Sequence, residues 1–220
     1  KKINPTLALV RLGANPDDLA YAASIIKKAQ SIGVQILGCD LDRNVSQQEL
    51  ESHITGFNQD KYVHGILIFR PLPAHLDEQA VLNLIAPEKD VDGVSEISMG
   101  KVYAGDKQGF GPCTAESCMA ILNHYNIPTQ GKKAVVLGRS LVIGKPVSMM
   151  LLGQNATVTI CHSKTQNLAT ECRQADILIA AIGKANFVTD EFVNANQVVI
   201  DVGINVDAEG KMSGDVDFDK

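Results

Sequence analysis

The sequence predicts an α/β protein with two lobes, each a parallel sheet covered by helices. Strand-like runs alternate with helical runs along the chain, and the late runs Ile177–Ala181 and Gln197–Val202 are too apolar for either face to meet solvent. Strands that are buried on both faces and separated by helices are typical of parallel sheets. The length of 220 residues suffices for two such lobes around a cleft.

The first lobe is predicted from its hydrophobic periodicity. The strands expected there are Thr6–Leu12, Gln35–Asp40 and Gly65–Phe69. The helices are Asp17–Ile32, Ser46–Asn58 and His75–Ile85, the second of them opened by a Ser-x-x-Glu capping box.

The second lobe repeats this alternation after a glycine-rich stretch at 100–111. Its expected elements are helix Ala115–Tyr125, strand Ala134–Leu137, a helix from Gly144, strand Thr157–Cys161 and a helix containing Thr170–Gln174, followed by the two apolar strands. We expect the lobes to divide into residues 1–122 and 123–220.

Composition limits the classes of protein. The net charge of −5 argues against a nucleic-acid-binding surface. No apolar run approaches the roughly 20 residues of a membrane helix, and neither end resembles a signal peptide. The five cysteines and five histidines show no metal-ligand spacing, so we expect reduced thiols, no metal and a cytoplasmic location. Because the chain starts Lys1-Lys2 without a methionine, we expect an incomplete N-terminus.

A nucleotide site is predicted where the strand Ala134–Leu137 meets a turn at Gly138 and a helix opened by Gly144 and Pro146. Such a helix N-terminus offers backbone N–H groups to a phosphate. The turn departs from the strict dinucleotide fingerprint, since Ser140 stands where a second glycine is usual.

The residues after the next strand favour NADP over NAD. An NAD site places an acidic residue about 20 positions on, where it binds the ribose hydroxyls. Here the chain reads Cys161-His162-Ser163-Lys164-Thr165, which has hydroxyls and a cation but no acid. Arg139 adds a fixed positive charge suited to a 2′-phosphate. The alternative is that Arg139 and Lys164 are solvated surface charges.

Several segments together resemble the methylenetetrahydrofolate dehydrogenase/cyclohydrolase family. They occur in the family's order: Pro71-Leu-Pro73, Lys89-Asp-Val-Asp-Gly93, Pro112-Cys-Thr114, Gly138–Pro146, Cys161–Thr165, Asp201-Val-Gly-Ile-Asn205 and Gly214-Asp-Val216. The resemblance implies two lobes around a cleft, with a Rossmann-like NAD(P)-binding C-terminal lobe and dimers formed through it. Because the family continues beyond the last segment, we also expect an incomplete C-terminus.

The implied activity is oxidation of 5,10-methylenetetrahydrofolate to the 5,10-methenyl cation with NADP, NAD being the alternative cofactor. Bifunctional members then hydrolyse the product to 10-formyltetrahydrofolate. The resemblance assigns catalysis to Asp92 and Tyr21, and folate binding to these two and Pro71, Leu72 and Pro73. It assigns cofactor binding to Gly138, Arg139, Ser140, Gly144, His162, Ser163, Thr165, Gly183, Gly203, Ile204 and Asn205.

Two departures bear on hydrolysis. The family usually carries Tyr-x-x-x-Lys in the first long helix, and a Gln before its Leu-Pro-Leu-Pro segment; here these positions are Ile25 and Phe69. In the family, that Gln hydrogen-bonds the Lys, and replacing both partners of a buried polar pair by apolar groups can be nearly neutral for stability. Isoleucine cannot transfer protons, so we expect a dehydrogenase with weak or absent cyclohydrolase activity.

Alternatives stay open at several positions. The chain could be bifunctional with Lys28, on nearly the same helix face as Ile25, as the base; Lys27 points away. It could also be a non-catalytic folate- or nucleotide-binding relative. If the strand continues past Phe69, Arg70 faces away from the cleft. Some candidate site residues could instead have purely structural roles. Tyr21 could pack beside Ile25 and Ile32, Asp90 and Asp92 could be turn residues, and Thr114 could cap its helix.

Overall fold

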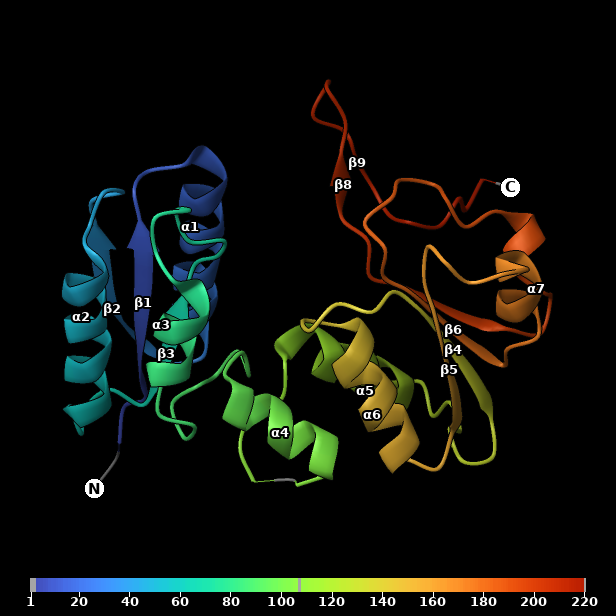
Figure 1. Ribbon diagram of the computed structural model, residues 1–220, viewed down its shortest axis with the longest axis horizontal. Coiled ribbons are helices and arrows are strands. Elements are labelled where there is room, and N and C mark those ends of the chain that lie inside the picture. The colour runs from blue at the N-terminus through green and yellow to red at the C-terminus, as the bar shows by residue number, and fades with distance from the viewer. Residues whose placement is uncertain (1–2, 107, 220) are drawn as a thin grey trace. The chain divides into compact units, whose positions relative to one another are not determined.

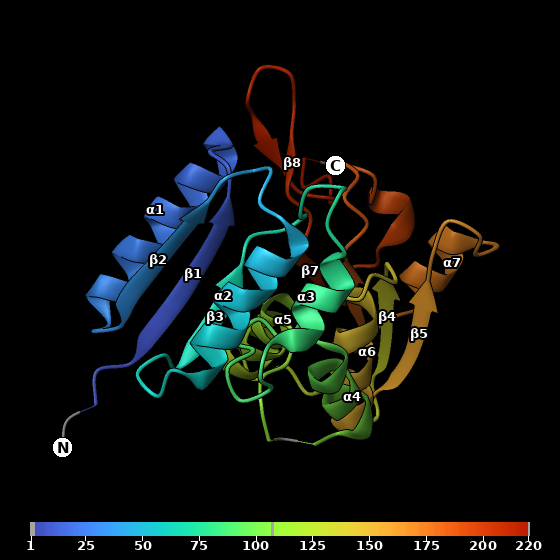
Figure 2. The same ribbon diagram turned by 60° about the vertical axis from the view of Figure 1, so that its left-hand side comes forward.

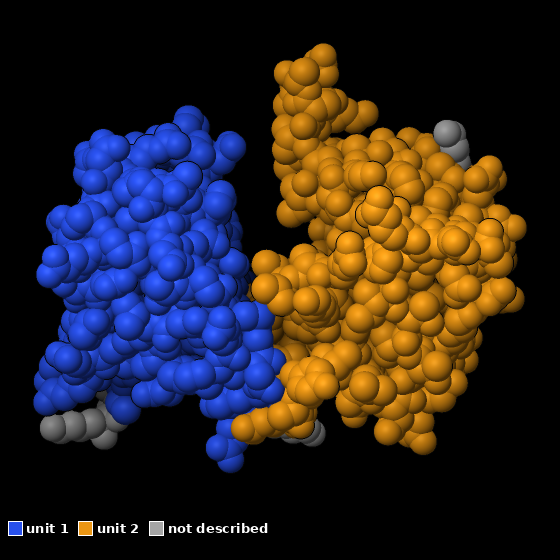
Figure 3. Space-filling view, viewed as in Figure 1, with its two compact units in different colours: residues 1–101, 107–111 blue, residues 102–106, 112–220 orange. Residues whose placement is uncertain are grey.

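The computed structural model describes residues 3–106 and 108–219 of the chain. They form two compact units (Figure 1; Figure 3). Unit 1 contains residues 1–101 and 107–111, and unit 2 contains 102–106 and 112–220. Among the described residues, no helix is long and apolar enough to cross a membrane.

Unit 1 has a three-stranded parallel sheet in the order β2-β1-β3. Its strands are β1 (Thr6–Leu12), β2 (Gln35–Leu41) and β3 (Gly65–Ile68). Each strand begins at the residue expected from the apolar pattern and ends within one residue of the expected end. Alternate side chains of β1, Ala8 and Val10, enter a core cluster with residues of β2 and β3.

Helices lie on both faces of this sheet, with α1 (Pro16–Ser31) and α2 (Gln47–Gln59) on opposite sides (Figure 1; Figure 2). The core cluster joins α2 and α3 (Glu78–Leu84) to the strands. Ser46 caps α2 by accepting a hydrogen bond from the Glu49 amide at 3.2 Å, as the capping-box pattern predicts.

Unit 2 has a four-stranded parallel sheet in the order β5-β4-β6-β7. Its strands are β4 (Lys133–Leu137), β5 (Thr157–Cys161), β6 (Ile177–Ala180) and β7 (Val198–Asp201). Along β4, Ala134 and Val136 enter one core cluster, and Val135 and Leu137 enter another. The sheet is therefore buried on both faces, which is why its strands read as continuous apolar runs.

The helices of unit 2 divide between these two cores. One core joins α5 (Cys113–His124) and α6 (Gly144–Gly153) to the sheet, and the other holds Cys172 of α7 (Leu168–Arg173). A single-turn helix, η1 (Asp190–Phe192), precedes β7. A hairpin of β8 (Asn205–Val206) and β9 (Met212–Ser213) follows it.

The units divide earlier in the chain than the boundary expected at residues 122–123. The buried face of α5, with Cys118 and Leu122, belongs to the same core as β4 and β6, and so α5 lies in unit 2. The division itself passes through α4 (Glu96–Ala104), a helix that the glycine-rich composition near residue 100 concealed.

Candidate functional site

The residues expected to bind folate lie in unit 1, around the end of β3. Phe69 follows the strand directly, and its amide donates to the Val10 carbonyl at 2.9 Å. The Phe69 side chain is buried, and its ring makes an edge-to-face contact with that of Tyr21, with 5.3 Å between ring centroids. Tyr21 itself is 56% exposed on α1. It therefore packs on Phe69 and keeps surface available for a ligand.

Arg70 meets the acid that the resemblance makes catalytic. Its Nη2 lies 3.7 Å from Oδ2 of Asp92, and both side chains are partly buried. The expectation that Arg70 faces away assumed that the strand continues through it. Instead β3 ends at Ile68 and the chain turns at the cis Arg70–Pro71 bond.

The neighbouring candidates divide into structural and accessible residues. Leu72 is buried in the core cluster of unit 1, whereas Pro71 is exposed and Pro73 half-buried. Asp90 is fully buried, and its carboxylate accepts from the amides of Val94 and Ser95 at 3.1 and 2.9 Å. Asp90 thus organises the turn before α4.

Ile25 is half-buried and lines a separate, largely apolar pocket of about 370 Å³. That pocket is also lined by Lys28, Ala29 and Ile32, but Tyr21 is not among its lining residues. Lys28, the candidate hydrolytic base, therefore shares the surroundings of Ile25.

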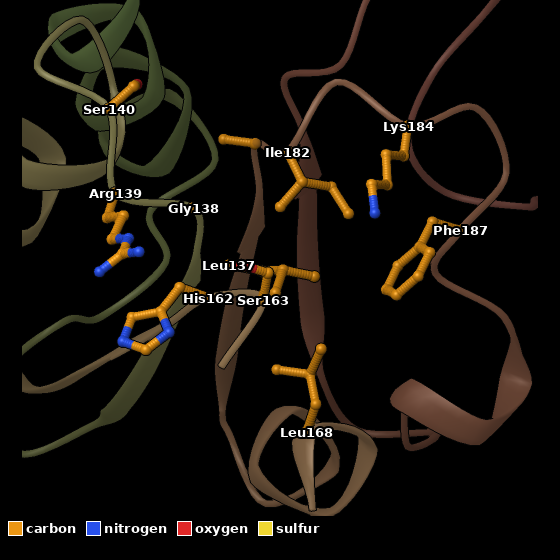
Figure 4. A pocket seen from close by; sticks show the side chains of 11 residues that line it. Leu137, Gly138, Arg139, Ser140, His162, Ser163, Leu168, Ile182, Lys184 and Phe187 are labelled. Carbon is orange, nitrogen blue, oxygen red and sulfur yellow. The ribbon is translucent and has the colours of Figure 1, made fainter. Parts of the chain in front are cut away.

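In unit 2 the candidate cofactor residues gather at the carboxyl ends of β4, β5 and β6, where open parallel sheets bind their ligands. A pocket of about 290 Å³ lies there. Its lining includes Gly138, Arg139, Ser140, His162 and Ser163, all expected from the sequence. Figure 4 shows Arg139 and His162 on one side of it, with Lys184 and Phe187 on the other.

The pocket is cationic. Arg139 and Lys184 line it, and none of its described lining residues is acidic. Nζ of Lys184 stands 5.4 Å from the centre of the Phe187 ring. Sequence reasoning missed Lys184 and Phe187, because only the fold brings them beside Arg139. The available signal was a Lys directly after Gly183, at the end of an apolar strand.

The N-terminus of α6 differs from the expected phosphate site. Ser140 Oγ accepts from the amides of Ile143 and Gly144, at 3.2 and 3.5 Å, and the Ser140 carbonyl accepts from the Lys145 amide at 3.0 Å. These N–H groups therefore serve the turn and are already bonded within the protein. Gly138 has φ +135°, and a Cβ there would collide with the Ala181 carbonyl.

The other expected cofactor residues support the pocket or lie outside its lining. Gly144 packs against the Gly138 backbone, and the Thr165 hydroxyl accepts from the His162 amide at 2.9 Å. Gly183 and Asn205 donate to a buried carboxylate, that of Asp215. A Cβ at Gly203 would collide with the same carboxylate, while Ile204 is exposed. Thr114 lies inside the first turn of α5, whose N-cap is Pro112.

Two thiols belong to one core cluster of unit 2, Cys161 at the end of β5 and Cys172 on α7. A hydrogen bond from the Cys172 thiol lowers the pKa of Cys161, and the same contact together with burial raises the pKa of Cys172. Both side chains are fully buried and serve packing. Among the described residues, no group of three or more His, Cys, Asp or Glu could hold a metal ion.

Two family models match the chain. The catalytic domain of tetrahydrofolate dehydrogenase/cyclohydrolase matches residues 1–92, and the NAD(P)-binding domain of the same family matches residues 112–220.

Named relatives agree with these matches. The bifunctional protein FolD of Clostridioides difficile is 54% identical over 98% of this chain and 75% of its own length. That of Carboxydothermus hydrogenoformans is 52% identical, over 100% and 77%.

Solved structures of relatives share the fold. The bifunctional dehydrogenase/cyclohydrolase FolD of Campylobacter jejuni has a TM-score of 0.96 at 40% identity, over 99% of this chain and 77% of that one. The Trypanosoma brucei enzyme, solved with NADP cofactor and an inhibitor, has a TM-score of 0.90 at 33% identity, over 98% and 75%. The α/β fold and the NAD(P)-binding unit expected from the sequence are thus confirmed, and the chain belongs to the tetrahydrofolate dehydrogenase/cyclohydrolase family.

Proposed function

We propose that this chain oxidises 5,10-methylenetetrahydrofolate to 5,10-methenyltetrahydrofolate with NADP. The observation that carries the proposal is the cationic pocket at the strand ends of unit 2, in a chain whose two units both match the family. When bound, NADP supplies a nicotinamide that accepts a hydride.

The residues of the pocket suit the 2′-phosphate that distinguishes NADP. Arg139 carries a permanent charge and a planar fork of donors, which binds phosphate oxygens in pairs. Ser163 adds a hydroxyl, and Lys184 a second positive charge. With no acid among the described lining residues, an added phosphate meets no repulsion there.

On the folate side, hydride loss requires no proton transfer, because the nitrogen lone pair expels the hydride and leaves a delocalised cation. The protein must orient the substrate and favour that cation. The Asp92 carboxylate supplies negative charge for this purpose. The exposed part of Tyr21, braced against Phe69, offers an aromatic surface to a flat ring system.

For the second activity, the relatives favour a bifunctional enzyme over the weak or absent hydrolysis expected from the sequence. We therefore extend the proposal to hydrolysis of the methenyl product. The aliphatic side chain of Ile25 cannot accept a proton, so the base must be another group. Lys28, three residues after Ile25 on α1, is our candidate, although the pocket that it lines with Ile25 contains none of the proposed folate residues. A dehydrogenase without hydrolysis is the second candidate, supported by the apolar side chains at positions 25 and 69.

The test follows NADPH and the methenyl cation separately by absorbance, with methylenetetrahydrofolate and NADP as substrates. We expect NADPH to form and the methenyl cation to decay faster with enzyme than without it. In Lys28→Ala the decay should slow to the uncatalysed rate while NADPH formation continues. Lys27→Ala, a neighbouring exposed lysine, is the matched control.

Each contrary result has a definite meaning. Stoichiometric build-up of the cation in the unmodified protein refutes the hydrolytic half and supports the second candidate. Absence of NADPH, and of NADH when NAD is used, refutes the dehydrogenase and supports a binding protein.

A cytoplasmic homodimer completes the proposal. The free state of all five cysteines supports a reducing compartment. The edge position of β5, with Ile160 36% exposed, supports association through unit 2. Light scattering at micromolar concentration should give twice the mass of the chain, and a monomer mass would refute the dimer.

A further inference from the structure

One wall of the cofactor pocket, segment 182–188, is built along segment 214–217. The Val188 amide donates to the Asp215 carbonyl at 2.9 Å, and Val188 and Val216 form a parallel bridge. The wall is thus positioned by residues about 30 positions later in the chain.

The side chain of Asp215 makes several further hydrogen bonds to the same wall. Its carboxylate is fully buried. Three consecutive backbone amides donate to it at 2.7, 3.0 and 2.8 Å, those of Ile182, Gly183 and Lys184. The Asn205 side-chain amide donates a fourth bond at 3.1 Å, which links the start of β8 to the same group.

Only a carboxylate suits this set of donors. An ionised carboxylate is an acceptor with about four lone-pair sites, which matches the four N–H groups. An asparagine in its place would keep one acceptor oxygen and direct an NH₂ group at amides that also donate. Buried donors without partners destabilise the folded protein.

A second carboxylate fixes Asp215 itself. Asp201, at the end of β7, accepts from the amides of Asp215 and Val216 at 2.9 and 3.0 Å. It also accepts from the Gly203 amide at 2.9 Å. Gly214 has no room for a side chain, because a Cβ there would collide with the Asp201 carboxylate. The position of Asp215 is therefore defined on both its backbone and its side chain.

We propose that Asp215 is a positioning residue of the cofactor site, which holds Ile182 and Lys184 in the geometry that receives NADP. This inference rests on the proposed use of NADP. Asp215 is not among the residues that line the pocket. It acts through the three amides, by fixing the backbone from which the Lys184 charge extends.

The test compares Asp215→Asn with Asp207→Asn. Asp207 undergoes the same chemical change and also accepts from backbone amides, those of Glu209 and Lys211, but is exposed in the β8–β9 hairpin. We expect the Kd for NADP, measured by calorimetric titration, to rise about tenfold in Asp215→Asn and to stay unchanged in Asp207→Asn. The KM for the folate substrate should change less than twofold in both. Equal NADP affinity in a folded Asp215→Asn protein overturns the inference, whereas failure of the unmodified protein to bind NADP overturns the proposed function itself.

Hydrogen exchange on the unmodified protein decides the matter if Asp215→Asn does not fold. The amides of residues 182–184 lie beyond the end of β6 and owe their protection to the Asp215 carboxylate. They should exchange as slowly as those of β6 before any NADP is added, and exchange as fast as in the β8–β9 turn overturns the inference.

Discussion

At the scale of single residues, the ion pair between Arg70 and Asp92 lies within the proposed folate site. A guanidinium is always charged and cannot act as a base near neutral pH. Arg70 can therefore hold Asp92 in place, but it cannot replace a proton-transferring lysine. In the proposed site, the contribution of Arg70 is to orient the Asp92 carboxylate.

Arg70→Leu should raise the KM for methylenetetrahydrofolate about fivefold, the size expected when a partly exposed ion pair is lost. The KM for NADP should stay unchanged, since the proposed cofactor residues lie in unit 2. Steady-state kinetics with each substrate varied in turn measures both constants. Arg70→Lys should recover part of the loss, and equal KM values in all three proteins would contradict the role.

Residues within one local motif were predictable, and residues brought together by the fold were not. Gly138, Arg139 and Ser140 follow a recognisable strand and were expected at the pocket, where they lie. Lys184 comes from a different crossover, so no spacing rule connects it to Arg139. The sequence also did not reveal that Ser140 would take up the amides that begin α6.

At the scale of elements, the junction of β4 and α6 depends on one backbone conformation. Gly138 has φ +135°, and its missing Cβ leaves room for the Ala181 carbonyl at the end of β6. The strand, the turn and the neighbouring strand end thus meet without a side chain between them.

Gly138→Ala should lower the free energy of unfolding by about 3 kcal/mol, from backbone strain and collision together. Gly153→Ala is the control, since Gly153 ends α6 with nothing near its Cβ position. Replacing a helical glycine should raise stability by about 0.5 kcal/mol. Urea denaturation measures both, and equal effects would show that the turn is not constrained.

The buried face of α5 gives the protein a sensitivity to alkaline pH. Burial raises the pKa of Cys118 from 9.0 to about 11, and a backbone hydrogen bond only partly opposes this. Because the folded state holds the thiol proton more tightly, its stabilisation is complete below about pH 9 and disappears as pH rises through about 11.

The free energy of unfolding should therefore fall between pH 9 and pH 11, with about 2 to 3 kcal/mol due to Cys118. Urea titrations at a series of pH values measure the decline. Cys118→Ala should make it shallower. Cys113→Ala, which removes an exposed thiol from the same helix, should leave the decline as it is. A Cys118→Ala curve parallel to that of the unmodified protein would refute this assignment.

Most elements were predictable because each strand and helix follows a regular apolar pattern. The helix α4 was not, since Gly100 and the glycines after it resemble a loop. Its start is organised by the buried Asp90 carboxylate, a tertiary feature that periodicity does not reveal. The short strands β8 and β9 were missed for a similar reason, because two-residue strands have no period.

At the scale of the whole molecule, the cores are separate. One core cluster lies in unit 1, and two lie on the faces of the unit 2 sheet. A ligand that binds only the folded form of one unit stabilises that unit by mass action.

NADP at 100 times its Kd should stabilise unit 2 by about 2.7 kcal/mol. Hydrogen exchange of the whole chain resolves the effect by position. Amides of β4 and β6 should exchange more slowly with NADP, while those of β1 and β3 should not change. Equal slowing in both units would show that the cores unfold together.

The distribution of thiols offers a practical tool. All five cysteines lie in the described part of the chain, and only Cys113, the first residue of α5, is exposed. The unmodified protein thus carries a natural attachment point for one maleimide probe. A second label at Gln48→Cys, at an exposed position of α2 in unit 1, would allow the distance between the two labels to be measured. Double electron–electron resonance between nitroxide labels at these two positions would then measure the distance between them with and without folate and NADP.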